Sequence, residues 1–449
     1  MATGRSNSNN CHSGGLRRLM KACWTPPRSV SQQRSHGIGQ EGGEGEGEEE
    51  ANDEETAPFI SLLPDDVFVE CLARLPRSSL QASMMVCHRW HDLLNSNEYY
   101  DLRRKIGKLE SMLYVLGGGG GGLASAVYSK QCKVWKAGLL FSTRTINIST
   151  NAWLLDYHTS HNSLLYAQPA VLDNKMFIIG AGLMAGPNSG GGGALNCTLI
   201  YDTWTKSLVR RSPMMCPRKK FACCVISSRI YVAGGSLRRG SCSTREAIVN
   251  AEEYVPELDL WRPISNMPRK RYGCLGAAVE GIFYVIGGLK FGKKNGFSVQ
   301  PYAYVSSMDS YDPKTNTWLK TKPLPVGGCV IACSVMGSCI YMLCSHAVEL
   351  SLWKYDTRKD SYTRIKSPPI PSPLRMDNVI KFCCVTMGTC IYIVQVGGSI
   401  DDLLRRSGRC ARGQKEGLVL IYDTKLQEWS RGPDLPFVRN GATCAVVDC

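Results

Sequence analysis

Short runs of apolar residues recur along most of this chain, and each stops at glycine or at a residue that takes its place. One such run, Ile282–Ile286, combines β-branched and aromatic side chains and is followed by Gly287 and Gly288. This composition suits a buried strand, and the glycines permit the positive φ angles that end it. The runs recur with a period of roughly 50 residues, which predicts a series of similar β-units. They end near Gly117, Gly180, Gly234, Gly287, Cys344 and Gln395.

A second signal lies downstream of each run, where two aromatic or apolar residues stand seven positions apart. Turn-forming residues, such as those at positions 312–316, separate the two members of a pair. Each pair therefore predicts an antiparallel hairpin. The six pairs are Ile146/Trp153, Tyr201/Leu208, Tyr254/Trp261, Tyr311/Trp318, Tyr355/Tyr362 and Tyr422/Trp429.

A further apolar segment precedes five of the runs, but the first run lacks one. Instead, the chain ends on a segment of this kind, residues 442–447, that has no partner of its own. We expect this last segment to complete the first unit, because a closed ring leaves no unpaired strand edge between its first and last units. The pattern predicts a mostly β protein, a six-bladed β-propeller closed by the C-terminal strand.

This repeat resembles the kelch motif, which builds one four-stranded propeller blade per copy. The resemblance covers residues 113–449. Three copies depart from the usual pattern: Leu208 and Tyr362 stand where Trp is common, Cys344 and Ser345 replace a Gly pair, and the sixth run is two residues longer.

Helical spacing of apolar residues is found before the repeats, in residues 62–100. Pro64 and the two acids after it predict a helix start, and Pro76 is expected to end that helix. Ser78 or Ser79 can cap a second helix. So short a segment cannot bury all of its apolar surface alone, which predicts a protein partner. The apolar stripe of the second helix contains Leu80, Met84, Cys87, Trp90 and Leu94.

This helical segment resembles the F-box, and an F-box followed by kelch repeats is typical of the plant F-box/kelch-repeat family. The resemblance implies the substrate receptor of an SCF-type ubiquitin ligase, with no catalytic residue and no cofactor. The F-box would bind a Skp1-like adaptor, and through it a cullin-RING ligase, while the propeller binds the target. The alternative for the docking positions is packing between the two helices. The residues expected to bind the adaptor are Leu62, Leu63, Pro64, Val67, Leu72, Leu75, Leu80, Val86 and Trp90.

Four segments follow from these patterns: a leader at 1–57, the F-box at 58–100, a linker at 101–112 and the propeller at 113–449. The leader opens without an acidic residue up to Ile38 and then becomes an acidic run from Glu41 to Glu55. Its apolar content is too low to offset the entropy of ordering, so we expect it to be disordered. The opening also resembles an organelle transit peptide in composition.

The formal net charge is +15, and the cations gather in the longer predicted loops. In an antiparallel blade, the loops from strand two to three and from strand four to the next blade emerge on one face. We expect this face to capture an acidic or phosphorylated target segment, because Arg binds carboxylates and phosphates in a bidentate manner. A solvated basic rim that selects nothing is the alternative. The expected substrate-face residues are Arg218, Lys219, Lys220, Arg238, Arg239, Arg269, Lys270, Arg271, Lys293, Arg405 and Arg406.

The same charge pattern raises a possible competitor within the chain. If the long loops bind acidic segments, residues 44–55 of the leader can fold back over them. Deleting the leader would then tighten target binding at low salt.

The composition of the chain indicates its cellular compartment and argues against a membrane helix. The chain has 21 Cys, but no Cys-x-x-Cys pair and no secretory signal, which predicts a reduced protein of the cytoplasm and/or nucleus. Residues 327–348 carry no charge, yet their glycine and serine content favours two strands over a membrane helix.

A non-enzymatic kelch scaffold without a ligase role is the alternative function, and two further functional classes are open. A copper oxidase on a kelch fold needs clustered His ligands, and the propeller segment holds only His158, His161 and His346. Nucleic-acid binding would explain the charge, but the basic loops lack interleaved aromatic residues. We therefore expect no specific nucleic-acid binding, no bound metal and no membrane association.

Overall fold

Two compact units make up the chain, Met1–Leu109 and Glu110–Cys449. The expected leader, residues 1–57, lies outside the described residues. A computed structural model describes residues 64–119, 122–129, 134–142, 167–181, 196–204, 207–238, 245–290, 294–295, 298–299, 303–325, 327, 329–346, 349–370, 380–397, 417–436 and 442–449.

The described part of the first unit is helical. It contains α2 (Asp65–Ala73), α3 (Arg77–Met84), α4 (His88–Leu94) and α5 (Asn97–Lys105). The first predicted helix starts after Pro64, as expected. The second was predicted as continuous but is broken, because Cys87 is extended, with φ −160°, and precedes α4. Pro76, and not a serine, occupies the position before α3.

Helix α5 extends the first unit beyond the predicted F-box boundary at residue 100. Tyr99 is buried, and its hydroxyl donates to the carbonyl of Leu72 at 2.6 Å. Arg103 is also buried and donates to the carbonyls of Ala73 (3.0 Å) and Leu75 (2.8 Å). These bonds satisfy carbonyls at the C-terminal end of α2 and fasten α5 to it. The compact unit consequently continues through the expected linker to Leu109.

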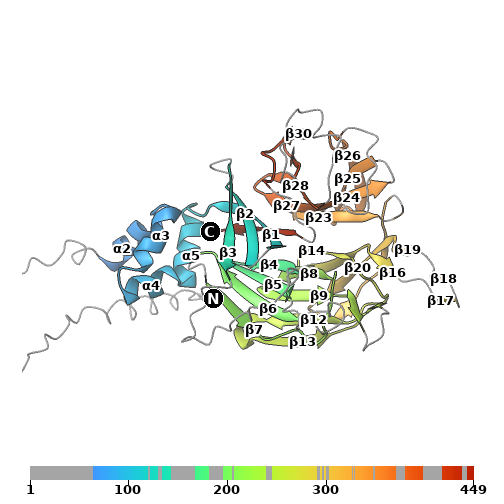
Figure 1. Cartoon of the computed structure of the whole chain (residues 1–449), viewed down its shortest axis with the longest axis horizontal. Coiled ribbons are helices and arrows are strands. Elements are labelled where there is room, and N and C mark those ends of the chain that lie inside the picture. The colour runs from blue at the N-terminus through green and yellow to red at the C-terminus, as the bar shows by residue number, and fades with distance from the viewer. Residues whose placement is uncertain are drawn as a thin grey trace, which may run out of the picture. The chain divides into compact units, whose positions relative to one another are not determined.

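The second unit is a β-propeller of six blade sheets (Figure 1), and its other described strands form three two-stranded sheets. The inner strand of each blade is given first. Blade one has β31 (Thr443–Asp448), β1 (Ser111–Gly119), β2 (Gly122–Ser129) and β3 (Val134–Ser142); blade two has β4 (Gln168–Leu172), β5 (Lys175–Ala181), β6 (Cys197–Asp202) and β7 (Leu208–Arg211); blade three has β8 (Ala222–Ile226), β9 (Arg229–Ala233), β12 (Ala251–Val255) and β13 (Leu260–Ile264).

The remaining blades follow the same order. Blade four has β14 (Leu275–Val279), β15 (Ile282–Ile286), β20 (Ser307–Asp312) and β21 (Thr317–Trp318), with β22 (Lys322–Pro323) also paired to β20; blade five has β23 (Val330–Met336), β24 (Cys339–His346), β25 (Glu349–Asp356) and β26 (Ser361–Ile365); blade six has β27 (Lys381–Met387), β28 (Cys390–Gly397), β29 (Val419–Asp423) and β30 (Glu428–Arg431). Loops carry the short strands β10 (Ser236–Arg238), β11 (Arg245–Ala247), β16 (Leu289–Lys290), β17 (Lys294–Asn295), β18 (Ser298–Val299) and β19 (Ala303–Tyr304), and the 3-10 turn η2 (Pro256–Leu258).

The C-terminal strand closes the ring, as predicted. β31 pairs antiparallel with β1, with Tyr114 opposite Ala445 and Ser111 opposite Asp448. The inner strands β4, β8, β14, β23, β27 and β31 also contact one another in turn, and β31 contacts β4. The last strand therefore supplies the inner strand of blade one and brings the two ends of the repeat array together.

Blade one corrects one predicted pair. Ile146 and Trp153 lie outside the described residues, and the outer strands of this blade are β2 and β3, which come earlier in the chain. Their backbone register places Tyr128 opposite Trp135, again seven positions apart. Gly118 and Gly119 are the last residues of β1 and pair with Leu123 and Gly122 of β2, so the hairpin with this spacing comes earlier in the chain than we expected.

The other aromatic pairs face each other across strands three and four, and they tie neighbouring blades together. In blade four, Tyr311 is opposite Trp318, and the indole Nε1 donates to the carbonyl of Ser265 in the preceding loop at 2.7 Å. In blade five, Tyr362 replaces Trp, yet its hydroxyl donates to the carbonyl of Pro323 at 2.9 Å. Tyr362 thus preserves the bond between blades that the more common Trp makes.

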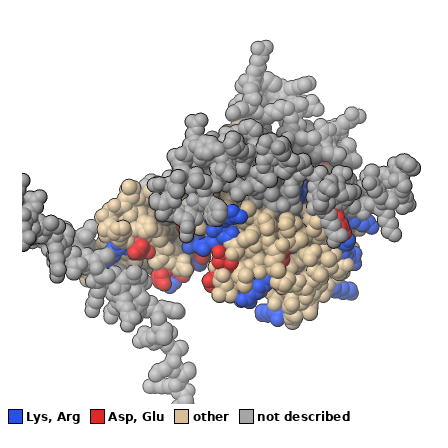
Figure 2. All heavy atoms as spheres, turned by 60° about the horizontal axis from the view of Figure 1, so that its bottom comes forward, with Lys and Arg blue, Asp and Glu red and all other residues tan. Residues whose placement is uncertain are grey.

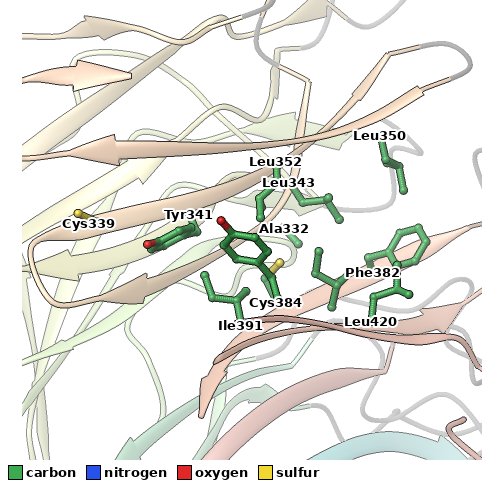
Figure 3. Close-up of a cluster of buried hydrophobic side chains, with 12 residues drawn as sticks. Ala332, Cys339, Tyr341, Leu343, Leu350, Leu352, Phe382, Cys384, Ile391 and Leu420 are labelled. Atoms are coloured by element: carbon green, nitrogen blue, oxygen red, sulfur yellow. The ribbon is translucent and has the colours of Figure 1, made fainter. Parts of the chain in front are cut away.

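The hydrophobic core lies mainly between adjacent blades. Figure 3 shows one cluster, in which Leu343 and Leu352 of blade five face Phe382 and Ile391 of blade six. Similar clusters fill the other interfaces for which buried residues are described. Five of the six pairs of neighbouring blades thus share a cluster of buried residues within the described part of the chain, which makes ring closure important for stability.

The uncharged span at 327–348 forms strands, as predicted. β23 and β24 pair antiparallel, and Gly337 takes a positive φ of 58° at the turn between them. Within the described residues, no helix is long and apolar enough to cross a membrane.

Candidate functional site

The first candidate surface is apolar and lies on the helical unit. Its most exposed large apolar side chains are Val67, Met85 and Val86, which are 44%, 82% and 61% exposed. Pro64 is exposed as well, while Leu75 and Trp90 are half-buried. Trp90 packs edge-on against Phe68, with ring centroids 5.4 Å apart. These three large apolar side chains therefore stay exposed although the four helices share buried residues.

Two residues expected on this surface are in the interior. Leu72 and Leu80 are 5% and 2% exposed, because α2 and α3 pack them against the rest of the helical core. They stabilise the unit and offer no surface to a partner, so their assignment as docking residues is corrected. Leu62 and Leu63 lie outside the described residues. Met85, which was not predicted, is exposed because α3 ends at the residue before it.

The second candidate surface is the long-loop face of blades three and four. We define it by the five loops that emerge there, at residues 212–221, 234–250, 265–274, 287–306 and 319–329. The sequence of these loops contains 14 Lys and Arg but one acid, Glu246. The short turns on the opposite face of the same blades contain Glu257, Asp259 and Glu280 but one cation, Lys314. The two faces thus differ in charge as the sequence predicted.

Arg218, expected to contact the target, is instead fully buried. Its guanidinium forms an ion pair with the Glu252 carboxylate and donates to the carbonyls of Gly234 (3.0 Å) and Asn250 (2.7 Å). The same carboxylate accepts from the backbone N–H of Met215 at 2.8 Å. The ion pair therefore links the loop that enters blade three to the base of the loop between its second and third strands.

Arg271 repeats this arrangement in blade four. It is fully buried, pairs with Asp309 at 2.5 Å and donates to the carbonyls of Gly287 (2.9 Å) and Ser307 (2.6 Å). Asp309 also accepts a hydrogen bond from the Thr321 hydroxyl at 2.7 Å. Arg218 and Arg271 cannot touch a target while they make these bonds, so both assignments to the substrate face are corrected. They position the loops that form the face.

Glu252 and Asp309 are functional residues that sequence reasoning missed. Each stands on the third strand of its blade, where a buried side chain is expected to be apolar. An acid at such a position needs a cation beside it, since an unpaired buried charge is costly. An acidic residue at a strand position that should be apolar was therefore the signal in the sequence that could have revealed these ion pairs.

Other predicted cations do reach the surface. Arg269 and Lys270 are exposed, and Lys219 and Lys220 are half-buried. Lys270 binds Glu246 at 2.6 Å. In the space-filling view, blue Lys and Arg side chains lie in separate groups, some beside red acidic side chains (Figure 2). The Arg238 side chain is not described, and Arg239, Lys293, Arg405 and Arg406 lie outside the described residues.

Tyr304 adds an exposed aromatic ring to this face. It is 55% exposed, at the end of the loop between the second and third strands of blade four. A hydrogen bond with the Cys329 thiol raises the pKa of its phenol. The described part of the face therefore carries an exposed aromatic ring as well as cations.

Comparison with known proteins decides the family. The F-box domain matches residues 60–102, and the Kelch motif matches residues 217–268 and 270–325. An F-box/kelch-repeat protein of Arabidopsis thaliana is 39% identical, with 98% of this chain and 100% of that protein covered. This chain belongs to the F-box/kelch-repeat protein family.

Two further similarities are weaker. Another F-box/kelch-repeat protein of Arabidopsis thaliana is 28% identical, over 59% of this chain and 62% of that protein. A solved structure titled "Structure of YjhT" has a TM-score of 0.44 and 15% identity, covering 60% of this chain and 84% of that one.

The two Kelch motif matches coincide with blades three and four. Within the described residues, blades three and four are the two that have both a Gly pair after the second strand and a buried Arg–carboxylate pair. The two Kelch motif matches thus cover the two blades that carry the long-loop face. In the described residues no group of three or more His, Cys, Asp or Glu could hold a metal ion.

Proposed function

We propose that this F-box/kelch-repeat protein is the substrate-recognition subunit of an SCF-type E3 ubiquitin ligase. Its F-box binds a Skp1-like adaptor, and through it a cullin-RING ligase, while the kelch propeller holds a protein target. The observation that supports this most directly is the exposure of the apolar side chains of Val67, Met85 and Val86 on a helical unit that matches the F-box domain. Each of these side chains contributes about 1.5–3 kcal/mol on burial, before the costs of association.

The proposed role needs no catalytic residue in this chain. A bound target is brought close to a conjugating enzyme carried by the ligase, which raises the effective concentration of its lysines. The propeller is suited to this, because its long loops are positioned by buried ion pairs. We place the protein in the cytoplasm and/or nucleus, where such ligases assemble and where its many free thiols remain reduced.

Charge on the exposed aliphatic surface should abolish adaptor binding. We expect the double variant Val67→Asp/Val86→Asp to lose the Skp1-like adaptor and the cullin from a purified complex, because both carboxylates would be desolvated without a partner. Co-purification of the tagged full chain with both proteins measures the effect.

Val209→Asp is the matched control. Val209 is 42% exposed, close to the 44% of Val67, but it lies on the outer strand β7 of the propeller. This variant should retain the adaptor at the wild-type level. Equal retention by the double variant, with unchanged helix content, would show that the docking surface lies elsewhere.

A further inference from the structure

We propose that Cys383 and Cys444 form an oxidation site, at which a small peroxide converts the two thiols to a disulfide that fastens the closing strand to blade six. Cys383 lies on β27, the inner strand of blade six, and Cys444 lies on β31, the inner strand of blade one. We call the contact between these two blades the closing interface. The inference goes beyond the ligase role and does not depend on it.

Both cysteine side chains face the closing interface. β27 and β31 contact each other. Cys383 is directly opposite Val394 on β28, and Cys444 is directly opposite Val115 on β1. Directly opposite residues of an antiparallel pair share one face of the sheet. Because Val394 and Val115 both belong to the cluster of buried residues between blades six and one, the two cysteines lie in that same cluster.

The Cys383 sulfur accepts hydrogen bonds from three groups of β31. The Cys444 thiol, the Cys444 backbone N–H and the Thr443 hydroxyl donate to it. The bond from the Cys444 thiol is the largest effect and lowers the pKa of Cys383, although burial opposes this shift. Burial, together with the same bond, raises the pKa of Cys444. The thiolate therefore forms on Cys383 while Cys444 keeps its proton.

Two cysteines on other inner strands provide a comparison. Cys223 on β8 and Cys333 on β23 are half-buried, as Cys383 is. Burial raises the pKa of each to about 12. Among the described cysteines with a shifted pKa, Cys383 is the one whose pKa is lowered. The thiolate is the nucleophilic form of cysteine, so Cys383 is expected to react before the other two.

Peroxide reaches Cys383 first, because Cys383 is half-buried and Cys444 is buried. The Cys383 thiolate attacks one oxygen of hydrogen peroxide, so that an S–O bond forms and the O–O bond breaks; the hydroxide that leaves takes up the proton that Cys383 had released. The Cys444 sulfur then attacks the sulfur of the Cys383 sulfenic acid, an S–S bond forms, and the S–O bond breaks. This second hydroxide takes the Cys444 proton. Two thiols and one peroxide thus give one disulfide and two waters.

The disulfide changes how the ring is held closed. In the thiol form, β31 is held by backbone pairing with β1 and by side-chain packing against blade six. The disulfide adds a covalent link between β27 and β31 and closes a loop of chain from residue 383 to residue 444, which restricts the unfolded chain. In a reducing compartment such a disulfide is transient, because dithiol reductants return it to two thiols. Oxidation thus stabilises the propeller reversibly.

Mass spectrometry of the peroxide-treated full chain tests the site. After treatment with hydrogen peroxide and blocking of the remaining thiols, we expect a disulfide between Cys383 and Cys444 within one polypeptide, located by fragmentation of the linked peptides. Dithiothreitol should remove it. A link from Cys444 to Cys384, the neighbouring residue on β27, would overturn the proposal. So would Cys383 and Cys444 that remain thiols after the treatment, or that link only to another copy of the chain.

Thermal unfolding of the full chain measures the consequence for the ring. Peroxide should raise the melting temperature of wild type by at least about 3 °C, and dithiothreitol should reverse the rise. Cys444→Ser should lose this response, because one of the two sulfur atoms is missing. The matched control Cys384→Ser, at a residue that is also 8% exposed, should keep it. Equal responses of the two variants would overturn the proposal, and the mapping in wild type decides the matter if Cys444→Ser does not fold.

Discussion

Arg271→Ala is expected to destabilise the propeller by about 3–5 kcal/mol, because it leaves the Asp309 carboxylate buried without its cation. The carbonyls of Gly287 and Ser307 lose their donors in the same variant. The midpoint of chemical denaturation, followed by tryptophan fluorescence, measures the loss. We expect a smaller effect on the helical unit, since it forms a separate compact body.

Two further variants separate this explanation from a general sensitivity of the loop. Arg269→Ala removes an exposed guanidinium two residues away and should change stability by no more than about 0.5 kcal/mol. Arg271→Met/Asp309→Leu should recover part of the loss, because no charge is left unpaired. If Arg271→Ala is as stable as Arg269→Ala, the buried ion pair does not hold these loops.

Deletion of residues 442–449 should prevent cooperative folding of the propeller. The deletion removes β31, exposes the hydrogen-bonding edge of β1 and uncovers buried side chains such as Leu113 and Val115. An unpaired inner edge also promotes association between chains. Thermal unfolding followed by circular dichroism, with size-exclusion chromatography, measures both consequences.

Asp448→Ala is the control for this deletion. Asp448 lies at the exposed end of β31, where it accepts a hydrogen bond from the Ser111 hydroxyl at 2.6 Å. The variant keeps the strand, so its melting temperature should stay within a few degrees of wild type. A deleted chain that melts as cooperatively as this control would mean that the ring closes without its last strand.

The repeating pattern made most of the fold predictable. The sequence predicted the strand order, the closing strand and five of the six aromatic pairs. These features were predictable because side-chain alternation and turn chemistry are local properties of the sequence. Blade one was misassigned because its second and third strands are joined by a very short connection after Gly119. We had expected the Ile146/Trp153 pair to mark the third and fourth strands of this blade.

The candidate site was less predictable, since burial depends on the fold around a residue. Arg218 and Arg269 each follow a proline in similar loops, yet one is fully buried and the other is exposed. In blade four it is Arg271, two residues after Arg269, that meets the acid on the third strand. In the same way, the prediction of one continuous helix through Cys87 was wrong, because Cys87 itself is extended and interrupts the helix.

Calorimetric titration of the purified full chain with a Skp1-like adaptor tests the central claim most directly. We predict one adaptor per chain, a negative heat-capacity change from apolar burial, and binding at least about 100-fold weaker for Val67→Asp/Val86→Asp but unchanged for Val209→Asp. Absence of binding by the folded wild-type chain, or equal affinities for all three proteins, would contradict the claim.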